Sequence, residues 1–338
     1  MASEARGAGA GADIGDGIRD GLHDGIRSFA HTDFDPEELV TAKGRRRVSV
    51  VIPARDEEAS VGAVVAAVIA DCVETTGLVD EVVVIDSDSV DESADRAAAA
   101  GAKVHAAADI RPDLGRAEGK GEALWKSQFV TTGDIVVFLD ADLVEWGTHF
   151  VTGLLGPLLL EERIQLVKAV YDRPLLAQDG TEAERGGRVT ELVARPLLAL
   201  HWPGLAGVVQ PLSGEWAVRR SAFSSYAVPV GYGVEIAALL DTYAAFGPQG
   251  IAQVELGRRT HRHHRHDTLG PMAVQVIAAT EARRGIRATL RPPGAAPVEL
   301  RQFDRVPAGF DRVSTGFVPR SRRVDVAERP PGTSVGPP

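Results

Sequence analysis

The chain has 338 residues, 44% of them hydrophobic, which is enough to build the core of one large domain or two modest ones. Its formal net charge of −10 argues against general nucleic-acid binding, which needs a broadly basic surface. The single cysteine, Cys72, excludes an intrachain disulfide and a cysteine-based metal cage, and it fits a cytoplasmic protein. No apolar run is long enough to predict a membrane span.

The two ends of the chain differ in composition from its middle. Residues 1–34 are rich in Gly, Ala and Asp, and we expect them to be disordered because they offer little surface to bury. A short helix is predicted to begin after Asp35, a good N-cap, and to end near residue 42. From residue 291 the chain is dense in Pro, Gly and Arg, which predicts a disordered tail over 291–338. The ordered domain is therefore expected over 35–290.

Strand-like and helix-like segments alternate after this first helix. The continuous β-branched run at 48–53 predicts a strand buried on both faces, and further strands are predicted at 81–86, 102–106 and 134–142. Helical patterns lie between them at about 57–70, 91–100 and 119–130. This order predicts an α/β fold with a mostly parallel, Rossmann-like sheet flanked by helices.

The second half alternates less regularly. Helices are predicted at 187–200, 233–246 and about 272–284, and strands at 207–210, 215–218 and 251–256. No linker-like stretch divides the two halves, so we expect the second half to complete the same globule.

In a parallel α/β sheet, ligands bind outside the carboxyl ends of the strands. Acidic residues follow the predicted strands at these ends. Asp140 and Asp142 come at the end of the strand at 134–142. Residues two apart on an extended segment point the same way, so both carboxylates can face one hard divalent cation that also binds substrate phosphates. The alternative is a solvated strand end or a helix cap.

Three further groups could act on the same ligand. His261 follows the strand at 251–256 and could complete a metal shell, unless the Arg- and His-rich stretch is only a solvated loop. Lys120, between Gly119 and Gly121 at a helix start, could hold a phosphate, unless this is a plain loop-to-helix junction. The stretch 186–190 could form a second anion cradle, or simply open a helix.

Together and in this order, these segments resemble the glucosyl-3-phosphoglycerate synthases of actinobacteria. The resemblance runs from about Asp35 to Arg284. The matching stretches are VSVVIPARDEEASV, VVVIDSDSVDES, GKGEALWKS, FLDADL, LVKAVYDRP, GRVTELVARPLL, VVQPLSGEWAVRR, GYGVEIAALLDTY and IAQVELGRRTHRH. The most specific of them are GRVTELVARPLL and GYGVEI.

The resemblance implies a GT-A fold and a homodimeric, metal-dependent, retaining glycosyltransferase. It would use Mg²⁺ or Mn²⁺ to move glucose from UDP-glucose, or another nucleotide-glucose, to 3-phosphoglycerate. The nucleotide half would cover about 45–145 and the acceptor half about 146–290, with an acceptor-binding C-terminal part.

The resemblance also implies roles for individual residues, carried over by motif position. The nucleotide would be held by Pro53, Ala54, Arg55, Glu57, Ser87, Lys120 and Asp140. The metal ligands would be Asp142 and His261. Lys120, Glu235 and the Leu212 backbone would lie at the reacting centre. The acceptor would be bound by Gly187, Arg188, Val189, Thr190, Tyr232 and His263.

The chain departs from the family pattern at Arg55-Asp56, at Ser213 and at His263, where the family has asparagine in the acceptor pocket. A paralogue that glycosylates another small anionic acceptor is therefore a second hypothesis. A sugar-phosphate nucleotidyltransferase is a third, although such enzymes carry a Gly-rich basic loop after the first strand. A non-catalytic sugar-nucleotide binding protein is the fourth.

Overall fold

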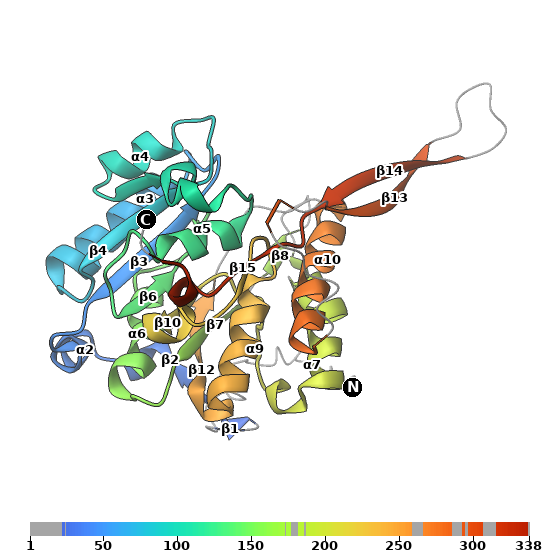
Figure 1. The fold of residues 1–338 in the computed structure, drawn as a ribbon. Helices are drawn as coiled ribbons and strands as arrows, with labels where there is room; N and C mark the ends of the chain where they lie inside the picture. Colours follow the sequence, from blue (N-terminus) through green and yellow to red (C-terminus); the bar gives the residue numbers. More distant parts are fainter. Residues whose placement is uncertain are drawn as a thin grey trace, which may run out of the picture.

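The structure is a computed structural model that describes residues 22–23, 25–172, 174–176, 182–185, 187–258, 266–285, 293–294, 297–306 and 316–336. Its centre is a nine-stranded sheet in the order β1-β2-β12-β7-β10-β6-β3-β4-β5 (Figure 1). The strands are β1 (Leu22–His23), β2 (Ile26–Ala30), β3 (Val48–Ala54), β4 (Glu81–Asp86), β5 (Lys103–Ala106), β6 (Ile135–Phe138), β7 (Leu166–Asp172), β10 (Trp216–Arg219) and β12 (Ile251–Arg258).

Helices cover both faces of this sheet (Figure 1). Side chains of α2 (Pro36–Lys43), α3 (Val61–Val68), α4 (Ser93–Ala99) and α6 (His149–Leu160) join the core on one face. On the other face, α5 (Lys120–Ser127), α7 (Arg195–His201), α8 (Arg220–Phe223), α9 (Val234–Phe246) and α10 (His266–Arg283) contribute. The predicted α/β fold with a mostly parallel sheet is confirmed.

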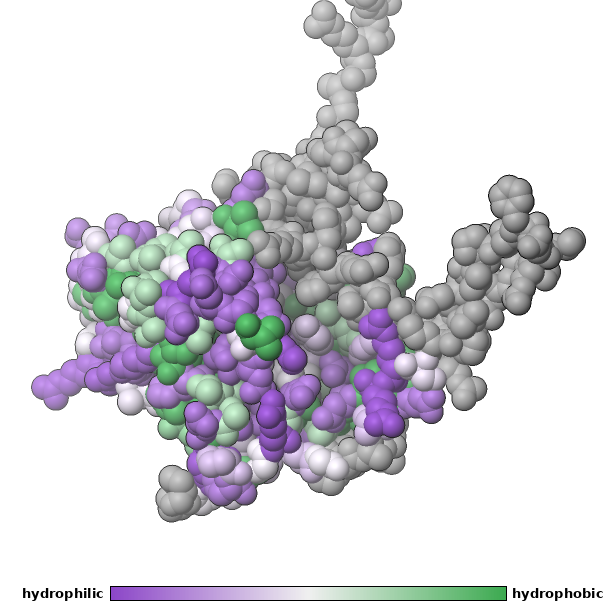
Figure 2. Space-filling view, turned by 90° about the horizontal axis from the view of Figure 1, so that it is seen from above, coloured by the Kyte–Doolittle hydropathy of each residue, from purple (hydrophilic) through white to green (hydrophobic). Residues whose placement is uncertain are grey.

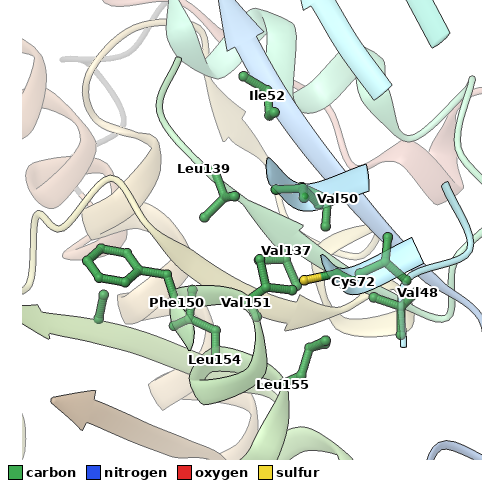
Figure 3. Packing of buried hydrophobic residues seen from close by; sticks show 14 of the residues in the cluster. Val48, Val50, Ile52, Cys72, Val137, Leu139, Phe150, Val151, Leu154 and Leu155 are labelled. Carbon is green, nitrogen blue, oxygen red and sulfur yellow. The ribbon is translucent and has the colours of Figure 1, made fainter. Parts of the chain in front are cut away.

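Strand β3 shows how the apolar runs determine this architecture. It pairs in parallel with both β4 and β6, so it has no free edge. Successive side chains of a strand point to opposite faces. Val50 and Ile52 therefore pack into the core beneath α3 and α6 (Figure 3), whereas Val51 packs into the core on the α5 side. Fully burying each such side chain contributes about 1.5–3 kcal/mol.

Two strands run against the others, β1 at the edge beside β2 and β10 in the middle of the sheet. Strand β10 lies antiparallel between β6 and β7, with Trp216 opposite both Phe138 and Lys168. The predicted strand at 207–210 is wrong, because these residues form a loop, in which Val208 is buried in the core on the α5 side.

The N-terminal segment departs from the disorder expected over 1–34. Residues 26–30 form β2, which pairs in parallel with β12 and buries Ile26 completely. Asp35 then caps α2 as predicted, because its side chain accepts hydrogen bonds from the backbone amides of Glu37 and Glu38 at 2.8 and 3.2 Å.

The C-terminal segment departs from the expected disordered tail. Strands β13 (Val298–Val306) and β14 (Gly316–Val324) form a hairpin that extends away from the body (Figure 1). Residues 321–336, which we call the C-terminal strap, then return across the domain, where β15 (Glu328–Arg329) pairs with β11 (Val228–Pro229). The strap is ordered through partners far from it in sequence, from Gln275, 50 positions before Asp325, to Glu122, 207 positions before Arg329, and composition does not reveal them.

On the face seen in Figure 2, hydrophilic and hydrophobic residues are interspersed. Within the described ranges, no helix combines the length and apolar character needed to cross a bilayer.

Candidate active site

A cavity of about 480 Å³ opens where the loops after β3, β4 and β6 meet the first turn of α5. The chain brings polar and charged groups to it from distant parts of the sequence. Its lining residues are Pro53, Ala54, Arg55, Glu57, Ser87, Glu118, Gly119, Lys120, Asp140, Ala141, Asp142, Tyr232, Arg323 and Asp325. All of the predicted nucleotide-binding positions lie along it, as do Asp142 and Tyr232.

Two aspartates in left-handed backbone conformations shape the loops on one side of the cavity. Asp56 and Asp88 have φ values of 56° and 60°, which Asp tolerates better than most residues. The Asp56 carboxylate accepts a hydrogen bond from the Val90 amide at 2.8 Å, and the Asp56 amide donates to Ser89 Oγ at 3.0 Å. These bonds tie the β3 and β4 loops together and hold their side chains at the cavity.

Lys120 is the centre of a buried charge cluster. Its Nζ lies 2.6 Å from Asp140 Oδ1 and 2.9 Å from Glu235 Oε1, and its side chain is only 15% exposed. Burial by itself lowers the pKa of Lys120, but Asp140 and Glu235 outweigh burial and raise it well above its ordinary value. Lys120 therefore stays protonated and keeps a positive charge at the cavity wall.

The glycines beside Lys120 are explained by packing against backbone. A Cβ at Gly121 would lie 1.8 Å from the Pro229 carbonyl oxygen, and one at Gly119 would lie 2.6 Å from that of Val230. In addition, the Glu122 amide donates to the Val230 carbonyl at 2.8 Å. The first turn of α5 thus lies directly against residues 229–231, just before Tyr232.

We expect Gly121→Ala to destabilise the fold by about 1–3 kcal/mol, the usual cost of overpacking, because a backbone carbonyl has to move. Chemical denaturation of the variant measures this effect. Gly62, a glycine inside α3 whose Cβ would meet nothing closer than 3.5 Å, gives a helical control without the close contact. Equal losses in the two alanine variants would show that the close contact has no cost of its own.

A second loop, which contains Gly214, also lies against Asp140. A Cβ at Gly214 would lie 2.3 Å from Asp140 Oδ2, so only glycine fits there without displacing the carboxylate. The preceding carbonyl, that of Ser213, accepts a hydrogen bond from the buried Lys168 Nζ at 2.8 Å. Leu212 is next in this loop and packs partly against the core on the α5 side.

Lys168 should make stability depend on pH. Burial lowers its pKa from 10.5 to about 7, and Glu235 offsets only part of this effect. Between pH 7 and 10.5 the unfolded chain therefore binds the additional proton, so this lysine makes stability rise with pH by about 1.4 kcal/mol per unit. The free energy of unfolding, measured by urea denaturation, should rise between pH 7.5 and 9.5 by about 2 kcal/mol less in Lys168→Met than in the wild type. Parallel curves for the two proteins would contradict this.

Asp140 and Asp142 supply the oxygen atoms that a hard cation prefers. Within the described residues, no group of three or more His, Cys, Asp or Glu side chains could hold a metal on its own. Mg²⁺ is commonly bound by one or two carboxylates together with substrate phosphates, so this pair at a cavity wall fits such an ion. His261, predicted as a metal ligand, and His263, predicted in the acceptor site, lie outside the described residues.

The remaining predicted positions lie away from the cavity lining. Gly187, with a φ of 103°, and Arg188 precede the helical turn that begins at Thr190, and Val189 is buried. Glu235 is buried behind Lys120. Glu118, Arg323 and Asp325 line the cavity but were not predicted. No local pattern marks Arg323 and Asp325, because the strap reaches the cavity only through the tertiary fold.

The fold and the cavity are those of a GT-A glycosyltransferase, and residues 49–162 match the model of Glycosyl transferase family 2. The glucosyl-3-phosphoglycerate synthase of Mycolicibacterium smegmatis is 46% identical over 305 residues, which cover 89% of this chain and 93% of the relative. That of Mycobacterium tuberculosis is 47% identical over 297 residues, or 87% of each chain. The chain belongs to the glucosyl-3-phosphoglycerate synthase family.

Solved structures of a glucosyl-3-phosphoglycerate synthase are also similar to this chain. The crystal structure of the M. tuberculosis synthase in complex with Mn²⁺, UDP and phosphoglyceric acid is similar with a TM-score of 0.75 and 44% identity, covering 89% of this chain and 95% of that one. The complex of the same enzyme with Mn²⁺, UDP-glucose and phosphoglyceric acid has a TM-score of 0.75 and 41% identity, covering 91% and 98%.

Proposed function

We propose that this protein transfers glucose from UDP-glucose to 3-phosphoglycerate and forms glucosyl-3-phosphoglycerate, with retention of the anomeric configuration. The observation that carries the proposal is the cavity at the sheet edge, where a buried, protonated Lys120 and the carboxylates of Asp140 and Asp142 meet. The relatives named above carry the same activity in their names, and one was solved with UDP-glucose and phosphoglyceric acid.

In the proposed reaction, Lys120 stabilises the negative charge that develops on the departing UDP. The acceptor hydroxyl attacks the anomeric carbon on the face that the leaving group vacates. The new glycosidic bond forms as the bond to the diphosphate breaks, and a leaving phosphate oxygen accepts the hydroxyl proton. Asp142 and His261 would hold Mg²⁺ or Mn²⁺, which would supply positive charge near the diphosphate. Catalysis then rests on positioning and electrostatics, without a protein nucleophile.

Glu235 has a positioning role in this scheme. It lies buried against Lys120, so it balances that charge and can accept hydrogen bonds from glucose hydroxyls. The backbone of Leu212 would lie near the reacting carbon, and Gly187–Thr190 with Tyr232 would hold the acceptor. We propose nucleotide and acceptor halves at about 45–145 and 146–290.

The assembly and location are also proposals. We propose a homodimer, for which the β13–β14 hairpin, which has nine paired positions and extends away from the body, is a suitable arm (Figure 1). We propose a cytoplasmic location because the single thiol, Cys72, is buried and its raised pKa, about 12, suits a structural rather than a redox role.

Incubation of the purified protein with UDP-glucose, 3-phosphoglycerate and Mn²⁺ tests the proposal, with the product identified by mass spectrometry and the anomer by NMR. We expect an α-linked glucosyl-3-phosphoglycerate and one UDP per product. A parallel series with 2-phosphoglycerate, glycerate and other phosphorylated acids tests the acceptor. Transfer only to another acid would identify a paralogue with a different acceptor. Conversion of UTP and a glucose phosphate into UDP-glucose would instead favour a nucleotidyltransferase.

A further inference from the structure

The C-terminal strap is fixed to the helix that carries Lys120. Arg329 is 3% exposed, and its guanidinium makes two hydrogen bonds of 2.7 Å to the buried Glu122 carboxylate. The same group donates to the carbonyls of Leu114 and Gly115 and lies over the Trp125 ring. Because Glu122 is two residues after Lys120, the strap is held against the first turn of α5.

A second attachment connects the strap to the cavity wall. The side chain of Gln275 on α10 donates to the Asp325 carbonyl at 2.9 Å and accepts a hydrogen bond from the Tyr232 amide at 2.9 Å. Asp325 and Tyr232 both line the cavity. This amide bridge therefore places the start of the strap beside the predicted acceptor residue.

Arg323 of the strap also lines the cavity. Lys120 is already neutralised by two carboxylates, and Arg55 Nη1 lies 4.0 Å from Glu118 Oε2. In contrast, the guanidinium of Arg323 makes no ion pair or hydrogen bond with any residue that the structure describes. It is an exposed side chain at the cavity, and it can turn toward a ligand.

The ligands of the proposed reaction carry more negative charge than the other cavity cations can balance. A nucleotide diphosphate and a phosphorylated acid together bring two phosphates of the donor, a third phosphate and a carboxylate. Arginine binds phosphate through two parallel N–H···O bonds, which makes it well suited to this task.

We infer that the C-terminal strap is part of the active site and supplies Arg323 as a ligand for a phosphate group of the bound substrates. The inference rests on the proposed function for the identity of those substrates. It does not depend on which of them Arg323 contacts, since the donor diphosphate and the acceptor phosphate present the same chemistry.

Arg323→Ala in the full-length protein tests the inference through binding and kinetics. UDP binding in the presence of Mn²⁺ is measured by isothermal titration calorimetry, and KM is measured for each substrate. We expect UDP affinity to fall about tenfold or KM for the acceptor to rise about tenfold, which corresponds to one charge-assisted hydrogen bond. Weaker UDP binding would place Arg323 on the diphosphate. Unchanged UDP binding with a higher KM for 3-phosphoglycerate would place it on the acceptor phosphate.

Arg322→Ala is the matched control. Arg322 precedes Arg323 on β14, so its side chain leaves the opposite face of the strand, and it does not line the cavity. Both variants should unfold at the wild-type temperature. If they match each other within twofold in UDP affinity and in both KM values, the inference is overturned. A wild-type protein that transfers no glucose, but whose UDP affinity falls on Arg323→Ala, would overturn the proposed function and leave this inference standing.

Discussion

Replacing Asp142 with alanine is expected to lower kcat by about a thousandfold or more and to leave the fold intact. Asp142 lies at the cavity wall two residues after Asp140, where a carboxylate can hold a divalent cation against the leaving diphosphate. Removing a ligand of a catalytic cation removes charge stabilisation that operates in the transition state, so kcat should fall more than substrate binding. Initial rates with UDP-glucose and 3-phosphoglycerate at saturating Mn²⁺ measure the effect.

Asp95→Ala provides the control for this variant, because Asp95 is an exposed residue of α4 outside the cavity. It should retain wild-type kcat. Circular dichroism of both variants should match that of the wild type. Full activity of Asp142→Ala, or of the wild type in excess chelator, would refute the metal role of this residue.

Lys120→Met should reduce kcat by about a hundredfold or more. The substitution removes the cation that we place beside the leaving diphosphate. It also leaves Asp140 and Glu235 as two carboxylates around an uncharged side chain, and like charges in such a position favour protonation of one of them. Steady-state kinetics across pH 6–9 should therefore show a lower kcat at every pH, with KM for UDP-glucose raised as well.

Lys103→Met is the comparison variant for Lys120. Lys103 Nζ lies 2.8 Å from Glu81 Oε2, so it also pairs with a buried carboxylate, but outside the cavity lining. Loss of this pair should lower stability and leave kcat unchanged. A Lys120→Met enzyme with kcat within threefold of wild type would show that the buried cation does not act on the leaving group.

The first half of the fold follows from local pattern. The runs at 48–53 and 81–86 became β3 and β4 because continuous β-branched sequence suits strands that are buried on both faces. Segments whose order depends on distant partners could not be predicted this way. Strand β2 is five residues long and is fixed by β12, and the strap is fixed by the Arg329–Glu122 pair across 207 positions of sequence.

The candidate site also contains residues that local sequence predicts and residues that only the tertiary fold brings to the cavity. Asp140 and Asp142 were predicted because parallel topology gathers strand ends at one edge of the sheet. Ser87 was predicted from the family resemblance. Lys120 was predicted as a phosphate ligand, and the structure adds that its glycines serve contact with the backbone at 229–231. Arg323 and Asp325 could not be predicted, since an arginine in a Pro-rich tail has no periodicity to connect it with a cavity formed some 200 residues earlier.

Titration of UDP into the wild-type protein, with Mn²⁺ and separately with excess chelator, tests most directly whether this cavity binds a nucleotide diphosphate through a cation. We expect saturable binding with one UDP per chain in Mn²⁺, and a loss of affinity of at least tenfold in chelator. Equal affinity in both conditions, or no binding in either, would contradict the account.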